Sequence, residues 1–118
     1  MKKILVVDND EKLLRLYQKE LSAEGYEVET AASAKEAYLK AETKTYDVII
    51  LEIVMPEING LEAMQHFFHL NRKQIIILNT NHPHYRDDFA AWGADAFVVK
   101  KEGDLAELKK EIGELLGL

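Results

Sequence analysis

The sequence contains no cysteine, which excludes disulfides, thiolate metal sites and cysteine nucleophiles together. It has only 2 prolines and 6 glycines among 118 residues, so no proline- or glycine-rich linker divides the chain. Long hydrophobic runs are also missing, since the first apolar run, Ile4–Val7, meets Asp8 at once and is too short for a signal peptide or a membrane span. We therefore expect residues 1–118 to form one cytoplasmic domain without a membrane anchor.

Clustered positive charge is scarce as well. The chain has 15 basic and 21 acidic residues, a formal net charge of -6, and no basic stretch longer than a pair such as Lys100-Lys101. Binding to nucleic acid requires clustered cations that contact phosphates. We therefore expect no direct contact with nucleic acid.

Two hydrophobic periods are present and alternate along the chain. Residues 4–7, 48–51, 75–78 and 97–99 are apolar on both faces, which is typical of strands buried in a parallel sheet, and residues 26–30 predict a flanking strand. Helical spacing follows each strand, and Pro83 predicts the start of the fourth helix. Five strand–helix units with short connections predict an α/β fold of three layers, with helices on both faces of a parallel sheet.

Polar residues stand at the carboxyl ends of the predicted strands, where ligands bind in sheets of this kind. They are Asp8, Asn9 and Asp10 after the first strand, Glu52 after the third, Asn79 and Thr80 after the fourth, and Lys100 after the fifth. Acids, an amide or hydroxyl, and a lysine from different strands would converge on one small pocket. Such a pocket suits a cation, an anion or both.

Three blocks of sequence together resemble the receiver family of bacterial two-component response regulators. They are residues 4–8, residues 47–60 and residues 93–100, and their spacing fits that family without a large insertion. The resemblance implies the flavodoxin-like receiver fold, with five parallel strands in the order 2-1-3-4-5. It also implies phosphorelay signalling through protein partners, namely a sensor histidine kinase, a phosphotransfer protein or a downstream regulator.

The resemblance further implies a role for each residue of the pocket. In the family an aspartate at the end of the third strand accepts the phosphoryl group, and Glu52 holds that position here. The implied Mg²⁺ ligands are Asp8, Glu52 and the backbone carbonyl of Val54, while Lys100 steadies the transferring group.

Two positions that respond to phosphorylation in the family are also implied. The hydroxyl switch position falls on Asn79, with Thr80 as its substitute if the strand end is shifted by one residue, and the aromatic switch position falls on Phe97. Pro56 and Gly60 shape the turn after the third strand, because proline fixes φ and an Asn-Gly pair tolerates positive φ.

Three departures from the family pattern weaken the implied chemistry. Glu52 has one more methylene than aspartate, and a shift of about 1 Å can slow a positioned reaction about a hundredfold. Asn9 replaces an acid, which weakens a Mg²⁺ site, and Asp10 lies one place beyond the usual position. Asn79 has an amide in place of a hydroxyl.

The leading hypothesis is therefore a degenerate receiver that is not an enzyme and acts as a protein-interaction module. We expect a monomer or a weak homodimer that docks through its fourth helix, fifth strand and fifth helix. One alternative is a phosphorylatable receiver with a natural or engineered Asp-to-Glu change at position 52. Another is a flavin- or nucleotide-binding protein, although the acidic loop of residues 8–11 repels phosphate.

Several of these residues also have a purely structural interpretation. The acidic loop at Asp8 to Asp10 can cap the first helix and complement its dipole. An aromatic residue at position 97 fits a plain core position as well as it fits a moving switch. For Trp92 we favour packing in the core over a place in a partner-facing patch.

Overall fold

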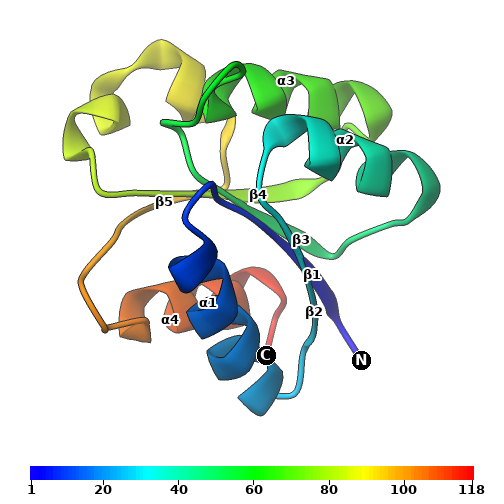
Figure 1. Ribbon diagram of the computed structural model, residues 1–118, viewed down its shortest axis with the longest axis vertical. Coiled ribbons are helices and arrows are strands. Elements are labelled where there is room, and N and C mark those ends of the chain that lie inside the picture. Colours follow the sequence, from blue (N-terminus) through cyan, green and yellow to red (C-terminus); the bar gives the residue numbers. More distant parts are fainter.

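The computed structural model describes residues 1–118 and contains one sheet of five parallel strands in the order β2-β1-β3-β4-β5 (Figure 1). The strands are β1 (Lys3–Val7), β2 (Glu27–Ala31), β3 (Val48–Leu51), β4 (Ile75–Thr80) and β5 (Ala96–Val99). The predicted fold class and strand order are confirmed. Val7 pairs with Leu51, and Leu51 pairs with Leu78, so the carboxyl ends of the central strands lie level with one another.

Helices cover both faces of the sheet. They are α1 (Glu11–Ala23), α2 (Ala34–Thr43), α3 (Gly60–Leu70) and α4 (Ala106–Leu115). Figure 1 shows α1 and α4 below the sheet and α2 and α3 above it, which gives the three predicted layers. Side chains cap the first turns of three helices: Asp10 caps α1, Ser33 accepts a hydrogen bond from the Glu36 amide of α2, and Asn59 accepts one from the Glu62 amide of α3. None of the helices has both the length and the apolar character needed to cross a membrane.

The core has two halves because the central strands are apolar on both faces. In β3, Ile49 and Leu51 belong to the cluster under α2 and α3, whereas Val48 and Ile50 belong to the cluster under α1 and α4. Successive side chains of a strand point to opposite faces, so a continuous apolar run supplies both clusters. The sheet is thereby fixed between its helices, and only its edges reach the surface.

The connection between β4 and β5 differs from the prediction. Pro83 begins a short 3₁₀ helix, η1 (Pro83–Asp87), and a second one follows, η2 (Phe89–Gly93), where we expected one α-helix. Asp88 separates them: its backbone is extended, at φ -79° and ψ 128°, and its side chain accepts a hydrogen bond from the Ala90 amide at 2.8 Å. An extended residue cannot continue the helical hydrogen-bond ladder, so the segment breaks into two turns.

Trp92 lies in the second of these turns, and the core position favoured for it is wrong. Its exposed fraction is 63%, and only Ala91 of this connection is fully buried. A single small residue does not form the apolar stripe with which a surface helix packs on a core. The large aromatic side chains of η2 are therefore left in solvent.

Candidate functional site

Four strands bring charged and polar side chains together at the carboxyl edge of the sheet. Lys100 Nζ lies 2.6 Å from Asp8 Oδ2 and 3.1 Å from Glu52 Oε2. The Thr80 hydroxyl lies 3.1 Å from Glu52 Oε1. Side chains from the ends of β1, β3 and β4 and from the residue after β5 thus form one connected network.

This network is almost closed to solvent. Asp8 is 2% exposed, Glu52 is 4% exposed, and the Lys100 side chain is 13% exposed. Charges interact more strongly here than in water, because little solvent remains to screen them. When both carboxyl groups are ionised, one ammonium group faces two carboxylates, so the site retains excess negative charge.

Burial and charge pairing shift the pKa values of the site in opposite directions. Burial raises the pKa of Glu52, and the nearby ammonium group of Lys100 and the Thr80 hydroxyl only partly offset it. Burial acts to lower the pKa of Lys100, but the hydrogen bond and charge of Asp8, together with Glu52, outweigh it and raise that pKa. Lys100 is therefore a firmly held cation at neutral pH.

Most of the carboxylate oxygens in the site already have donors within the protein. Asp8 Oδ1 accepts the Asp10 amide at 2.9 Å, and Asp8 Oδ2 accepts from Lys100. Glu52 Oε1 accepts from Thr80. Glu52 Oε2 is the exception, because its contact with Lys100 lacks the alignment of a hydrogen bond and it has no other partner. This oxygen is the one unsatisfied acceptor of the network.

The side chains of Asn9 and Asp10 do not join the network. Both residues are exposed. Asp10 is the N-cap of α1, where its Oδ1 accepts the amides of Lys12 and Leu13 at 3.0 and 3.3 Å. The capping role that the sequence left open for this loop therefore applies to Asp10.

Thr80, and not Asn79, contacts Glu52. The strand β4 extends through Thr80, two residues beyond the predicted end at Leu78. Side chains alternate along a strand, so Asn79 faces α1 and donates its side-chain amide to the Tyr17 hydroxyl at 3.0 Å. The contact with Glu52 thus falls on Thr80, the substitute for Asn79 at the implied switch position, because β4 continues past Leu78 and threonine is a good strand former.

Gly60 allows the chain to approach the site closely. A Cβ atom at this position would lie 2.1 Å from the carbonyl oxygen of Glu52, and the Gly60 amide donates to the Ile53 carbonyl at 2.7 Å. Gly60 is the first residue of α3 and has no positive φ, so the expected reason for its presence is wrong. The glycine is required because the start of α3 touches the backbone at the end of β3.

The positive φ of this loop belongs to Glu57, at 68°. The Ile58 amide donates to the Pro56 carbonyl at 2.8 Å, which closes a three-residue turn around Glu57. A turn of this kind with positive φ is rare and strained for a residue with a side chain. Val54 lies in the same loop and is 43% exposed.

The site continues into the β4–β5 connection, which the sequence did not reveal. The Thr80 hydroxyl oxygen accepts the His82 amide at 3.3 Å, just before η1. Farther along, the Arg86 guanidinium lies 5.1 Å from the ring centroid of Phe97 and donates to the Phe97 carbonyl at 3.4 Å. Phe97 is partly buried and is covered by this arginine. No periodicity or motif marks Arg86, because its contact depends on the fold of an irregular segment.

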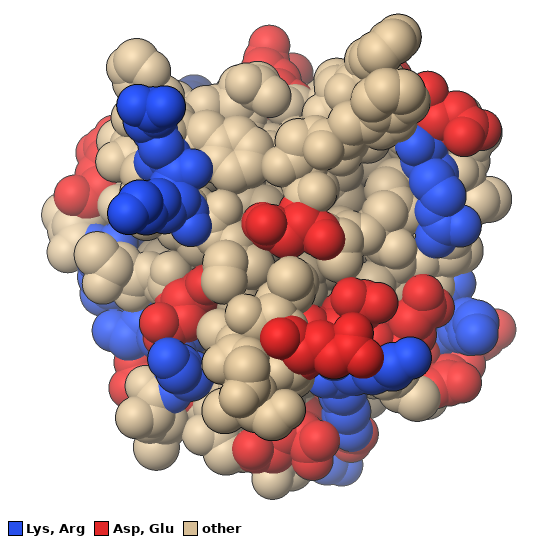
Figure 2. All heavy atoms as spheres, turned by 180° about the vertical axis from the view of Figure 1, so that it is seen from behind, with Lys and Arg blue, Asp and Glu red and all other residues tan.

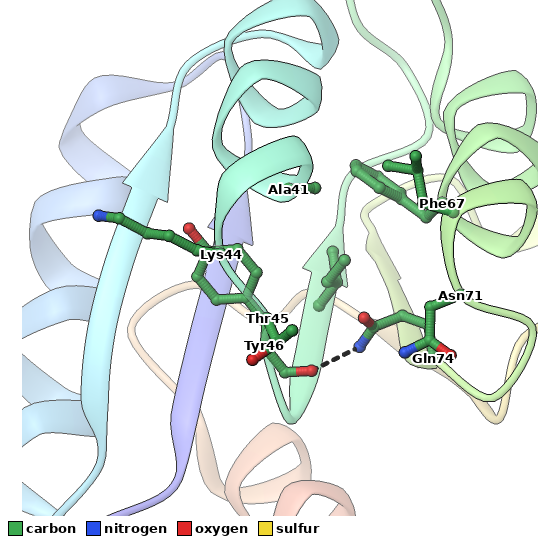
Figure 3. A pocket seen from close by; sticks show the side chains of 9 residues that line it. Ala41, Lys44, Thr45, Tyr46, Phe67, Asn71 and Gln74 are labelled. Atoms are coloured by element: carbon green, nitrogen blue, oxygen red, sulfur yellow. Dashed lines mark hydrogen bonds between the residues drawn. The ribbon is translucent and has the colours of Figure 1, made fainter.

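Three cavities are present, and one of them, of about 320 Å³, is an open hollow between the start of α1 and the end of β2. The other two differ in their distance from the network. One of about 280 Å³ lies between α1 and the connection from β5 to α4, and Lys100 and Tyr17 are part of its wall. The other, of about 90 Å³, lies at the opposite edge of the sheet between α2 and α3 (Figure 3). There the Gln74 side chain donates to the Tyr46 carbonyl at 3.0 Å, so polar groups are paired within the fold. The carboxyl edge is therefore the candidate site.

Sequence comparison agrees with this geometry. The response regulator receiver domain family matches residues 4–113. The response regulator ArlR of Staphylococcus saprophyticus is 36% identical over 118 residues, which cover 98% of this chain and 53% of that protein. ArlR of Staphylococcus aureus strain Mu50 is 35% identical with the same coverage. The chain thus spans about half the length of the curated relatives it matches.

Solved structures give the same result. The response regulator TrrA of Thermotoga maritima, in complex with Mg²⁺ and BeF, has a TM-score of 0.93 at 42% identity, over 98% of this chain and 99% of that one. TrrA in complex with the histidine kinase ThkA has a TM-score of 0.92 with the same identity and coverage. The chemotaxis protein CheY4 of Vibrio cholerae has a TM-score of 0.88 at 30% identity, over 98% of both chains. The chain belongs to the response regulator receiver domain family of two-component signalling.

Proposed function

We propose that residues 1–118 form one receiver domain that responds weakly or not at all to phosphoryl donors and acts as a protein-interaction module, not as an enzyme. The observation that carries this proposal is the contact of Glu52 with both Thr80 and Lys100. Glu52 holds the position at which the family accepts phosphate. Its carboxylate therefore already engages the hydroxyl and the ammonium group that would bind a phosphoryl group.

Glu52 acts as a weak built-in anion in this proposal. A phosphorylated side chain has a charge of about -1.5 to -2 at neutral pH, whereas a glutamate has at most one negative charge. The glutamate satisfies the Thr80 hydroxyl without chemistry and holds the end of β4 in one arrangement. Partner binding is then largely independent of phosphoryl donors.

A divalent cation is held weakly in the proposed site. Mg²⁺ requires near-octahedral oxygen ligands and binds through carboxylates. Lys100 already neutralises Asp8 and contacts Glu52, while Asn9 is neutral and Asp10 caps α1. The ligands that remain are Glu52 Oε2 and backbone carbonyls such as that of Val54, which fit Mg²⁺ poorly. The Mg²⁺ and BeF complex of TrrA makes Mg²⁺ the cation to test.

The proposed partners are proteins, and we propose no direct contact with nucleic acid. The complex between TrrA and the histidine kinase ThkA, at 42% identity to this chain, supports a sensor kinase as one partner class. A phosphotransfer protein or a downstream regulator is another. Figure 2 shows the face opposite to that of Figure 1. Its basic side chains lie in separate groups among acidic ones and form no continuous basic patch. The net charge of -6 further disfavours direct contact with phosphates.

A second candidate function is a working receiver in which glutamate accepts the phosphoryl group. Glu52 Oε2 favours it, because this buried carboxylate oxygen has no hydrogen bond and would be free to attack phosphorus. The phosphoryl group would pass from an acyl phosphate donor to that oxygen, releasing the donor carboxylate. This candidate makes phosphorylation of Glu52 directly detectable.

The two candidates differ in the mass of the protein after treatment with acetyl phosphate and Mg²⁺. The wild-type chain, Glu52→Asp and the non-nucleophilic Glu52→Gln are incubated and weighed intact. We expect no phosphoryl adduct on the wild-type chain or on Glu52→Gln, and an adduct on Glu52→Asp. An adduct on the wild-type chain that Glu52→Gln lacks would overturn the proposal and establish the second candidate.

A further inference from the structure

Two aromatic side chains stand together on the surface of η2. Phe89 is 80% exposed and Trp92 is 63% exposed, and their ring centroids are 4.5 Å apart. They are the only aromatic residues among the large exposed hydrophobic side chains. Figure 1 shows the β4–β5 connection, which carries this pair, at the upper left. Exposed aromatic pairs are enriched at protein–protein interfaces, where they supply much of the binding energy.

The aromatic pair is held by a fixed backbone. Ala91, between the two rings in sequence, is 5% exposed and belongs to the core cluster under α2 and α3. Asp88 caps the turn through the Ala90 amide at 2.8 Å. Gly93 lies against α3, since a Cβ atom there would be 3.5 Å from Met64 and from Phe68. A preorganised pair loses little conformational entropy when a partner covers it.

The charged side chains of the connection that carries the aromatic pair are mainly acidic. The connection has the carboxylates of Asp87, Asp88 and Asp95, and none of them takes part in a salt bridge. Its one guanidinium, that of Arg86, is engaged with the ring and carbonyl of Phe97. A partner that covers the rings and complements this rim therefore has cations beside an apolar anchor.

We propose that Phe89 and Trp92 anchor a protein segment with an apolar face flanked by lysine or arginine. The inference rests on the proposed function, because it specifies which surface the interaction module uses and the chemistry of its partner. The rings supply apolar contact area, and Asp87 and Asp88 select for positive charge. A second copy of this chain is a poorer match, because it would bring the same carboxylates to the interface.

Trp92 is the only tryptophan of the chain, so its fluorescence reports directly on this surface. The probe is a synthetic amphipathic peptide of leucine and lysine with helical spacing, about 14 residues long. A second peptide of the same design has glutamate in place of lysine. We expect the lysine peptide to shift Trp92 emission to shorter wavelength with saturation, and to bind at least about tenfold more tightly than the glutamate peptide.

Variants distinguish peptide binding at this surface from general attraction of a basic peptide to an acidic protein. By calorimetry, we expect Phe89→Ser and Trp92→Ser to weaken the lysine peptide about tenfold or more, and Asp87→Asn to weaken it severalfold. The matched controls on α2, Leu39→Ser and Glu42→Gln, replace an exposed leucine and an exposed carboxylate and should leave binding unchanged. Thermal unfolding of each variant checks that the fold is retained.

Two results would overturn the inference. One is an equal loss of binding in the control variants, which would mean that only net charge matters. The other is a concentration-dependent dimer in sedimentation that Trp92→Ser dissociates, which would assign the aromatic pair to a second copy. Neither result depends on the acetyl phosphate experiment, so a failure here is distinct from a failure of the proposed function.

Discussion

The Thr80 hydroxyl donates a hydrogen bond to the Glu52 carboxylate at 3.1 Å, and both side chains are buried. The same hydroxyl oxygen accepts the His82 amide at 3.3 Å. Thr80 therefore joins the end of β3 to the start of the β4–β5 connection. A change at position 52 that moved the carboxylate would reach this connection through one side chain.

Thr80→Val tests the energetic weight of this contact. Valine has nearly the shape of threonine but cannot donate, so Glu52 would lose its only hydrogen-bond donor on Oε1 while remaining buried. We expect the free energy of unfolding to fall by about 1–3 kcal/mol in urea denaturation at neutral pH. Thr45→Val is the control, because Thr45 is exposed and its hydroxyl makes no hydrogen bond. Equal effects of the two variants would contradict a structural role for the Thr80 contact.

Much of the fold could be predicted from the sequence because its dominant signals are local. Continuous apolar runs such as Ile4–Val7 indicate buried parallel strands, and the capping residue Ser33 indicates the start of α2. The polar residues at the strand ends were found for the same reason, since parallel strands end at one edge of the sheet. Asp8, Glu52 and Lys100 can therefore be identified from the sequence alone.

The features that could not be predicted depend on contacts between distant segments, which local sequence patterns do not contain. Whether β4 ends at Leu78 or at Thr80 is decided by pairing with β5, where Thr80 is opposite Val99. The two turns in place of the fourth helix follow from the extended backbone of Asp88. The residue type of Trp92 favours a core position, yet its burial depends on the path of that irregular segment.

Lys100→Met should be the most damaging single change in the site. It removes the only cation beside Asp8 and Glu52, whose side chains are 3% and 5% exposed, and leaves two buried carboxylates without a neutralising charge. We expect a loss of about 3–5 kcal/mol of stability by urea denaturation at neutral pH. The double variant Lys100→Met with Glu52→Gln should recover part of this loss.

Lys101→Met is the matched control for that experiment. Lys101 is the next residue, is exposed and makes no salt bridge, so its replacement should change stability by no more than about 0.5 kcal/mol. A similar loss in the two single variants would mean that Lys100 acts through general charge and not through its contacts.

Gly60→Ala and Gly113→Ala should have opposite effects on the free energy of unfolding. At Gly60 a Cβ atom would lie 2.1 Å from the Glu52 carbonyl oxygen, so α3 or the end of β3 must move, and we expect a loss of at least about 1–3 kcal/mol. At Gly113, inside α4, nothing lies within 4 Å of the added Cβ atom, and alanine should stabilise the helix by about 0.5–1 kcal/mol. Thermal unfolding of both variants measures the difference, and destabilisation by both would refute the steric explanation for Gly60.

The effect of Glu52→Gln should depend on pH with a defined sign. Burial raises the folded-state pKa of Glu52 above its ordinary value of 4.5, so above about pH 4.5 the folded chain holds this proton more strongly than the unfolded chain does. Stability falls with rising pH wherever the folded state binds more protons. Glutamine does not titrate, so the stability of the wild-type chain minus that of Glu52→Gln should be greatest below pH 4.5 and decrease as the pH rises through the folded-state pKa.

Urea denaturation at constant ionic strength, from about pH 4 to about pH 8, measures this difference. The raised pKa of Lys100 does not interfere, because stability linked to it is lost only above the ordinary lysine value of 10.5. Glu42→Gln on α2 controls for the removal of one exposed carboxylate. If the difference instead increases with pH, pairing with Lys100 outweighs burial, and Glu52 is a stabilising anion and not a strained one.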